Sequence, residues 1–224
     1  MTKVAILVDG GFYRKVSNAC KGHRNPEEKA DELINYCLRH LKRKHDDGYD
    51  ELYRIFYYDC PPIEKVVYHP LTKENMDFSK SDTKKWSEEF FDELAKRRKV
   101  ALRFGELSDG SVNFNLNPGA TRKLLSGKLR IENLNEHDFT LNVKQKGVDM
   151  KIGLDIASLA FKKQVDKIVL IAGDSDFVPA AKLARREGID FVLDPLGNKI
   201  KSSLSLHIDG IQTCDKDYWN QHDS

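Results

Sequence analysis

The sequence predicts an α/β fold: a three-layer α/β/α sandwich with a central, mostly parallel sheet and a hairpin-like insertion. Short apolar runs rich in β-branched residues, at 3–9 and 166–174, are typical of strands that are buried on both faces. Segments with apolar residues at helical spacing alternate with these runs. Such alternation implies parallel strands with helices covering both faces of the sheet.

The first half of the chain opens with the strand at 3–9, which Gly10–Gly11 ends. Asn25 followed by Pro26 is a helix-start signal, and Pro61–Pro62 interrupt the chain after an aromatic strand. The elements expected here are a helix over 26–45, a strand over 51–58, a long loop over 61–80, a helix over 82–98 and a strand over 100–107.

The second half begins with residues 108–146, where Asn, Gly and Ser are dense and short alternating pieces predict a hairpin insertion. Such a segment belongs on the surface and often carries binding. We therefore expect one domain, 1–224, with this inserted segment. The elements expected after it are a helix over 147–164, a strand over 166–174, a helix from Ser175/Asp176 to Gly188, a strand over 189–194 and a short helix over 199–205.

Composition narrows the class of protein. No apolar run reaches the roughly 18 residues that a membrane span needs. The apolar start of the chain is broken by Asp9 and is no signal peptide, which leaves the cytoplasm as the expected compartment. The four cysteines form no CxxC pair, so we expect reduced thiols rather than disulfides or a zinc site. The net charge of +2 gives no argument for nucleic acid, so any such argument depends on local clusters.

Four carboxylates are expected to converge at one edge of the sheet. Asp9 and Asp174 each follow a buried strand. Ligands of open parallel sheets bind beyond the carboxyl ends of the strands, where the strand order reverses. If these two strands are neighbours there, both carboxylates face one crevice. Asp176 lies two residues further on, and Asp149 lies in the first turn of the preceding helix.

This convergence indicates a cation. Two like charges about 4 Å apart repel by roughly 4 kcal/mol at an effective dielectric near 20. Protonation or a divalent ion relieves that repulsion. Oxygen ligands without His or Cys partners suit Mg²⁺ or Mn²⁺, and such ions activate water and stabilise charge on a phosphodiester. The expected chemistry is metal-dependent phosphodiester hydrolysis.

Each carboxylate also has a structural interpretation. Asp174 or Asp176 can cap the following helix, although capping needs only one of them. Asp9 can be a turn residue, and Asp149 a partner of the helix dipole. Asp155 lies on the apolar face of its helix and needs a partner there, so it either belongs to the metal site or, if the helix is rotated, lies at the surface.

Four further residues are candidates for binding substrate. Lys146 and Lys151 flank Asp149 and can hold the phosphates of a nucleic-acid strand. Ser202 and Ser203 either contact phosphate or belong to a solvated helix.

Three segments, in this order, resemble motifs of the NYN family within the PIN-like nuclease superfamily, in particular its LabA-like proteins. They are VDGGFYRK at 8–15, KGVDMKIGLDIASLA at 146–160 and LIAGDSDFVPAA at 170–181, whose GDSDF is the most specific. The resemblance implies the three-layer fold, single-stranded RNA as substrate and an Mg²⁺ or Mn²⁺ site built by Asp9, Asp149, Asp174 and Asp176, with Asp155 as a further candidate. The implied activity is that of a metal-dependent endoribonuclease, and a homodimer stays open.

One departure from the family pattern keeps two alternatives open. Many NYN proteins have Asn two residues after the first aspartate, where this chain has Gly11. The chain can therefore be a weak or inactive module that binds RNA or protein. A phosphatase of the haloacid-dehalogenase kind also uses an Asp after the first strand, but it needs further aspartates where this chain has Gly11 and Val178.

Overall fold

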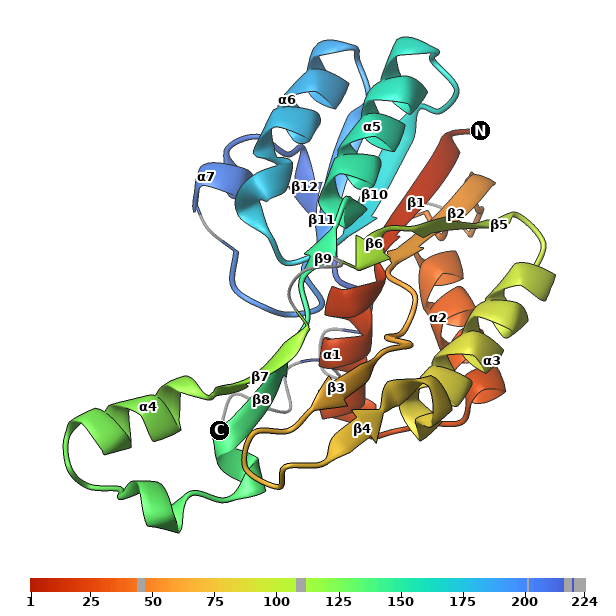
Figure 1. The fold of residues 1–224 in the computed structure, drawn as a ribbon. Helices are drawn as coiled ribbons and strands as arrows, with labels where there is room; N and C mark the ends of the chain where they lie inside the picture. The colour runs from red at the N-terminus through yellow and green to blue at the C-terminus, as the bar shows by residue number, and fades with distance from the viewer. Residues whose placement is uncertain (44–46, 108–111, 201, 216–218, 220–224) are drawn as a thin grey trace. The chain divides into compact units, whose positions relative to one another are not determined.

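Six parallel strands form the central sheet, in the order β12-β11-β10-β1-β2-β5 (Figure 1). Their bounds are β1 (Lys3–Asp9), β2 (Glu51–Asp59), β5 (Val100–Phe104), β10 (Lys167–Ile171), β11 (Asp190–Asp194) and β12 (Gly210–Ile211). The chain moves from β1 to β2 and β5 on one side, and to β10, β11 and β12 on the other. The strand order therefore reverses between β1 and β10, which are hydrogen-bonded neighbours, so the condition for Asp9 and Asp174 to leave the sheet side by side is met.

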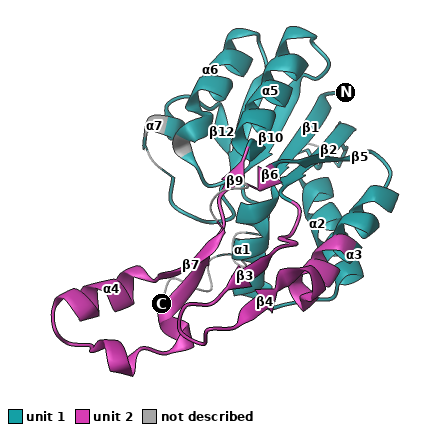
Figure 2. Cartoon of the chain, viewed as in Figure 1, with its two compact units in different colours: residues 1–60, 89–105, 147–224 teal, residues 61–88, 106–146 magenta. Residues whose placement is uncertain are grey.

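This computed structural model describes residues 1–43, 47–107, 112–200, 202–215 and 219, except for the side chains of Ser175 and Ser203. It divides into two compact units, coloured separately in Figure 2. The first unit comprises 1–60, 89–105 and 147–224, and the second comprises 61–88 and 106–146. The segment predicted as an insertion thus shares its unit with residues 61–88. All four cysteines are free thiols, as expected.

Helices cover both faces of the central sheet, which confirms the predicted fold class. Right-handed crossovers place the helices between β1 and β5 on one face and those after β5 on the other; α5 and α6 lie side by side in Figure 1. The bounds are α1 (Gly10–Lys21), α2 (Pro26–Arg39), α3 (Asp82–Lys96), α5 (Val148–Phe161), a 3₁₀ turn η4 (Ser175–Phe177), α6 (Val178–Arg186) and α7 (Ser202–Ser205). In the described residues, no helix is long and apolar enough to cross a membrane.

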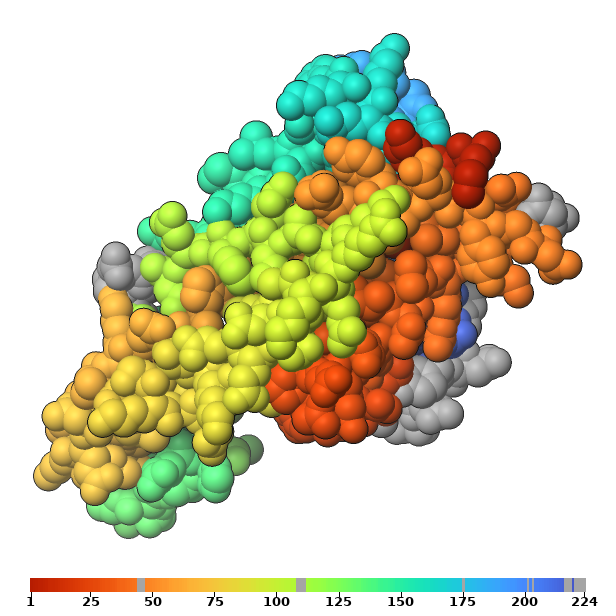
Figure 3. All heavy atoms as spheres, turned by 90° about the vertical axis from the view of Figure 1, so that its right-hand side faces the viewer, coloured from red at the N-terminus to blue at the C-terminus, as the bar shows by residue number. Residues whose placement is uncertain are grey.

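The core lies between the sheet and these helices. Val4 to Val8 of β1 are completely buried, as are Ile168 to Ile171 of β10. Residues from Glu89 onward place the end of α3 in the first unit. In Figure 3 this yellow-green end lies beside the orange-red α2, where Arg97 Nη2 is 2.8 Å from Asp31 Oδ1.

Helix α1 was not predicted, because the two glycines were interpreted only as the end of a strand. The Asp9 carboxylate accepts a hydrogen bond from the Phe12 backbone N–H at 3.0 Å and so caps the helix. A Cβ at Gly10 would lie 2.4 Å from Tyr57 Cζ and 2.7 Å from the Tyr58 carbonyl oxygen. Glycine is therefore required here by close packing of α1 against β2, not by a turn.

Other boundaries also differ from the prediction. Helix α2 ends at Arg39, earlier than expected, and the strand expected over 100–107 divides at Gly105 into β5 and the short β6 (Glu106–Leu107). The helix expected from Ser175 starts only at Val178, after the turn η4, although Gly188 does follow its end with a φ of 86°. Strand β12 was missed because only two residues pair.

The second unit is built from three small antiparallel pairs. Their strands are β3 (Val66–Tyr68) with β4 (Asn75–Asp77), β6 with β9 (Gln145–Lys146), and β7 (Asn113–Leu116) with β8 (Phe139–Asn142). It also contains α4 (Pro118–Leu125) and 3₁₀ turns at η1 (Phe78–Lys80), η2 (Ile131–Asn133) and η3 (Glu136–Asp138). The pair β7–β8 confirms the predicted hairpin, although the helix α4 between its strands was not predicted.

The prediction of a long loop over 61–80 is wrong, because this segment contains the β3–β4 hairpin. The buried His69 accepts hydrogen bonds at Nδ1 from the Leu71 and Thr72 backbone N–H groups, each at 3.3 Å, and this stabilises the connecting turn. The His69 ring also packs 4.4 Å from that of Phe114, centroid to centroid. One histidine thus joins the two chain segments of the second unit.

Candidate active site

The strands β1 and β10 end together at the carboxyl edge of the sheet. Val8 pairs with Ile171, so Asp9 and the segment Ala172–Asp174 leave the sheet at the same level. A Cβ at Gly173 would lie 2.4 Å from the Phe12 ring, so this segment passes directly against α1. Asp9 and Asp174 therefore follow adjacent strands at the position where the strand order reverses.

Asp9 is half-buried, and the charged groups that act on its carboxyl group are other carboxylates. Burial raises the pKa of Asp9 to about 6, although the hydrogen bond from the Phe12 N–H lowers it. The carboxylates of Asp149 and Asp59 raise the pKa further. Charging Asp9 thus costs free energy that a nearby cation would offset.

Asp149 connects Asp9 electrostatically to the other two predicted site residues. It lies in the first turn of α5. Burial raises the pKa of Asp149, and the carboxylates of Asp174 and Asp176 raise it further. Because Asp149 also raises the pKa of Asp9, electrostatic repulsion links all four carboxylates. We call Asp9, Asp149, Asp174 and Asp176 the carboxylate cluster.

Of the two aspartates Asp174 and Asp176, the first makes a structural hydrogen bond through its carboxylate and the second, in the described residues, does not. The Asp174 carboxylate accepts a hydrogen bond from the Asp176 backbone N–H at 3.1 Å, so Asp174 caps the turn η4, whereas helix α6 begins without a side-chain cap. Asp176 is exposed, and in the described part of the chain its carboxylate has no hydrogen bond or ion pair. Capping therefore does not account for the second aspartate of the pair.

The carboxylate cluster fits a hard divalent cation by its chemistry. All of its donor atoms are carboxylate oxygens, the ligands that Mg²⁺ and Mn²⁺ prefer. Within the described ranges, no group of three or more His, Cys, Asp or Glu side chains is close enough to hold an ion by itself. One or two carboxylates with several waters are nevertheless the usual protein contribution to an Mg²⁺ site.

Asp155 has protein partners instead. Its Oδ2 accepts a hydrogen bond from Tyr58 OH at 2.8 Å and lies 3.0 Å from Arg103 Nε. These contacts join α5 to β2 and β5. The partner that this carboxylate requires on an apolar face is thus an arginine, and its charge is compensated without a metal.

The predicted substrate-binding residues have different surroundings. Lys151 of α5 donates a hydrogen bond from Nζ to the Phe104 carbonyl oxygen. Lys146 is exposed in β9 of the second unit, and Ser202 is exposed at the start of α7. The side chain of Ser203 lies outside the described part of the structure.

Asp59 was not among the predicted site residues, and the structure gives it several hydrogen-bond partners. It ends β2 and is buried, with Arg14 Nη2 at 2.9 Å, Tyr57 OH at 3.0 Å and the Cys60 N–H at 2.8 Å as donors. Burial raises the pKa of Asp59, and Arg14 partly opposes this. The available sequence signal was its position, since Asp9 and Asp59 both end buried strands of one sheet.

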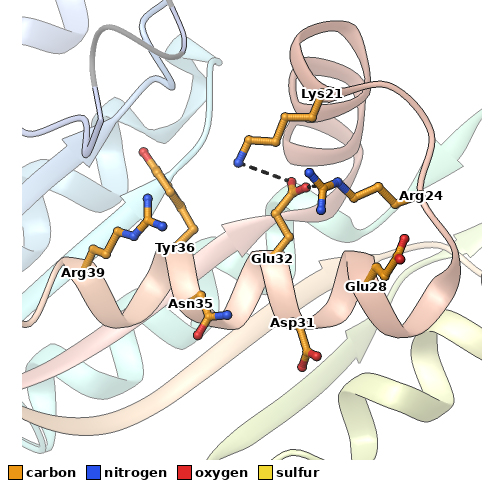
Figure 4. Close-up of a pocket in the computed structure, with 8 residues that line it drawn as sticks. All are labelled: Lys21, Arg24, Glu28, Asp31, Glu32, Asn35, Tyr36 and Arg39. Carbon is orange, nitrogen blue, oxygen red and sulfur yellow. Dashed lines mark ion pairs between the residues drawn. The ribbon is translucent and has the colours of Figure 1, made fainter.

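A separate polar pocket lies at the other end of α1 (Figure 4). It has a volume of about 410 Å³ and is lined by Lys21, Arg24, Glu28, Asp31, Glu32, Asn35, Tyr36 and Arg39. Lys21 and Arg24 approach Glu32 at 3.8 and 3.1 Å, so its carboxylate already pairs with cations. Because α1 has 12 residues, about 18 Å of helix separates this pocket from Asp9.

Comparisons with known proteins identify the family. The sequence profile described as the NYN domain matches residues 74–205, more than half of the chain. This range includes Asp149, Asp174 and Asp176 but not Asp9. An uncharacterized protein of Methanocaldococcus jannaschii is 32% identical over 100 residues, which are 45% of this chain and 38% of that protein. The chain thus matches less than two-fifths of that relative's length.

One solved structure aligns with nearly the whole length of this chain. A protein of unknown function from Vibrio parahaemolyticus aligns over 96% of this chain and 94% of its own, with a TM-score of 0.47 and 13% sequence identity.

Proposed function

The chain belongs to the NYN domain family, and from this premise we propose that it is a metal-dependent endoribonuclease of the LabA-like branch. The observation that carries the proposal is the carboxylate cluster at the reversal point of the sheet, where bound ligands of such folds are found. The GDSDF sequence at 173–177 is the specific link to the branch.

Asp9, Asp149, Asp174 and Asp176 would hold one or two Mg²⁺ or Mn²⁺ ions. A divalent ion bound there supplies activation of water and stabilisation of the charge that develops on the phosphodiester. The backbone N–H groups of Phe12 and Asp176 fix the orientation of the Asp9 and Asp174 carboxylates. These two carboxylates are thereby preorganised, which reduces the reorganisation needed on ion binding.

Lys151 is the best-placed cation for the substrate. It lies two residues after Asp149 on α5, and its hydrogen bond to Phe104 uses one of its three N–H donors. The other two donors remain for a phosphate of single-stranded RNA. Lys146, Ser202 and Ser203 are further proposed contacts, and a homodimer is a proposed state of assembly.

The test is cleavage of a mixed-sequence single-stranded RNA by purified protein in Mn²⁺, Mg²⁺ or EDTA. We expect metal-dependent cleavage by the wild type and a loss of at least 100-fold in Asp174→Asn, because charge stabilisation at a preorganised site commonly contributes about 10²–10³ in rate. Asp92→Asn, at an exposed position of α3, is the matched control and should cleave like the wild type. Cleavage that persists in EDTA would contradict the proposed chemistry.

A second function is favoured by one observation, Gly11 in place of the common Asn. A chain whose site has one ligand fewer can bind RNA without cutting it. RNA binding in EDTA, combined with no cleavage by well-folded wild type in either metal, would establish this alternative. A phosphatase is disfavoured, since Gly11 and Val178 stand where it needs aspartates; turnover of p-nitrophenyl phosphate that Asp9→Asn abolishes would revive it.

A further inference from the structure

A second feature with the chemistry of nucleic-acid binding lies in the second unit, in and after α4. Residues 118–131 contain four cations and no acidic residue. The cations are Arg122, Lys123, Lys128 and Arg130, and we call this group the α4 basic turn. All four are exposed, and in the described part of the chain none of them forms an ion pair.

The backbone brings these cations together. Gly127 follows α4 with a φ of 70°, and its N–H donates to the Leu124 carbonyl oxygen at 3.0 Å. The chain then doubles back, because the Lys128 and Leu129 N–H groups both donate to the Lys123 carbonyl oxygen, at 2.9 and 3.1 Å. Residues on either side of Gly127 therefore present their charges in one compact turn.

Helix capping explains only half of this charge. Arg122 and Lys123 are in the last turn of α4, where cations interact favourably with the helix dipole. Lys128 and Arg130 lie beyond the helix, and they bring like charges close to the first pair. Arg97, which is less exposed, pairs with Asp31, whereas these four cations have no acid paired with them in the described residues. Unpaired cations held together by the backbone indicate an anionic ligand.

The same turn exposes apolar surface. Leu125 is 85% exposed and Ile131 is 74% exposed, although both are large apolar side chains. Single-stranded nucleic acid offers phosphates to cations and unstacked base faces to apolar side chains. A flexible polyanion fits a turn that carries four cations and two exposed apolar side chains, with Glu132 as the first acid after it.

We propose that the α4 basic turn binds single-stranded RNA, with its four cations contacting successive phosphates and Leu125 and Ile131 contacting bases. This inference rests on the proposed function for its choice of RNA as the ligand, but not on cleavage. It gives the second unit a binding role of its own.

Binding is measured by fluorescence anisotropy of a labelled mixed-sequence RNA of about 20 nucleotides, in EDTA so that no metal-dependent cleavage occurs. The test variant is R122Q/K123Q/K128Q/R130Q. The matched control, K162Q/K163Q/K182Q/R186Q, removes the same charge from exposed positions of the first unit. A third variant, K128Q/R130Q, leaves the cations of α4 itself in place.

We expect the test variant to bind at least 10-fold more weakly at about 0.1 M KCl, and the control less than threefold more weakly. The slope of log K against log salt should fall by about 0.7 per lost phosphate contact, so by up to about 2.8 in the test variant and about half of that in K128Q/R130Q. Equal losses in test variant and control would overturn the inference, because they would report net charge alone.

Other results would also overturn it. One is an RNA affinity that is unchanged in the test variant, and another is a wild type that does not bind RNA. A third is a test variant that loses binding to phosphatidylserine vesicles but not to RNA, which would assign the turn to a membrane surface. Failure of the proposed nuclease activity is distinguishable. If the wild type binds RNA through the turn but cleaves none, the inference stands and the nuclease proposal fails; cleavage with unchanged binding by the test variant gives the reverse.

Discussion

Two pairs of aspartates occupy the same place in the fold and have opposite surroundings. Asp59 and Asp194 end β2 and β11, and both are buried among donors. Asp9 ends β1 and Asp174 follows β10, and both accept backbone hydrogen bonds at the start of a helix or turn, at 3.0 Å from the Phe12 N–H and 3.1 Å from the Asp176 N–H. Carboxylates at equivalent strand ends therefore differ in how far their charge is compensated, according to the number of donors around them.

Asp194 has hydrogen-bond partners from several segments of the chain. It accepts hydrogen bonds from Tyr36 OH, from Thr213 Oγ1 at 2.8 Å and from the Leu196 N–H at 2.8 Å. His40 Nε2 lies 2.8 Å from its Oδ2. These donors come from α2, the residue after α2, the turn after β11 and the chain that follows β12. Asp194 thus connects distant segments, and the carboxylate cluster connects none in this way.

The difference has an energetic meaning. Removing one partner of a buried, paired charge leaves the other uncompensated, which is strongly destabilising. Removing one of several repelling carboxylates costs little stability or adds some. Carboxylates that repel one another without compensating partners are candidates for function.

The largest effect is expected for Asp194→Asn, which leaves a buried His40 without its counter-charge. The free energy of unfolding should fall by about 3–5 kcal/mol, measured by urea denaturation. Asp190→Asn, on the same strand but exposed, loses only a surface ion pair with Lys167 and should change stability by less than about 1 kcal/mol. A loss below about 1 kcal/mol for Asp194→Asn would remove the distinction between the two classes.

The second effect is stabilisation by metal. Because an ion would bind the folded state only, Mn²⁺ at about 100 times its dissociation constant should add about 2.7 kcal/mol to the free energy of unfolding. Asp9→Asn and Asp174→Asn should abolish most of this increment. Asp155→Asn should retain it, since Arg103 and Tyr58 already occupy that carboxylate. An increment lost equally in all three variants would place Asp155 among the ligands.

Some of these features could be predicted from the sequence alone, and others could not. The central strands follow from apolar periodicity, and the parallel-sheet rule places Asp9 and Asp174 at one edge of the sheet once β1 and β10 are neighbours, as they are. The partners of Asp155 were beyond reach, because Arg103 is 52 residues away and meets it only through the packing of α5 on β5.

Two other failures have the same origin. Gly10 was interpreted as a terminator because its tight contact with Tyr57 is a tertiary fact, invisible in a two-residue pattern. Asp59 was not predicted to matter, because Arg14 of α1, which pairs with it, is 45 residues away in the sequence. Local signals predicted the elements, and only the folded chain showed which charges were compensated.

The third effect is a pH dependence of stability in metal-free protein. The pKa of Asp9 is raised to about 6, so the folded state favours its protonated form. That contribution is fully present below about pH 3.8 and is lost as pH rises through about 6. Asp9→Asn should flatten this part of the stability curve, whose amplitude we expect to be on the order of 1–2 kcal/mol after solvent screening.

His40 should act in a different window. Burial by itself lowers the pKa of His40, but hydrogen bonding to Asp194 and Cys214 raises it to about 9. Its contribution is fully present below about pH 6.5 and is lost as pH rises through about 9, so Asp9→Asn should leave this upper window unchanged. A single transition that Asp9→Asn shifts as a whole would contradict the separation of the two regions.

The smallest effect is expected at Gly11. A Cβ there would lie 3.5 Å from Asp9 Oδ1, an ordinary contact, so Gly11→Asn places an amide beside the carboxylate cluster without a clash. RNA cleavage should rise by roughly twofold to tenfold, within about 1.4 kcal/mol of barrier, while stability changes by no more than about 0.5 kcal/mol. Gly10→Ala is the matched control, because its Cβ would overlap Tyr57 and should destabilise α1 by about 1–3 kcal/mol. Unchanged cleavage in a well-folded Gly11→Asn would show that this glycine does not limit the site, and that the four carboxylates alone set its activity.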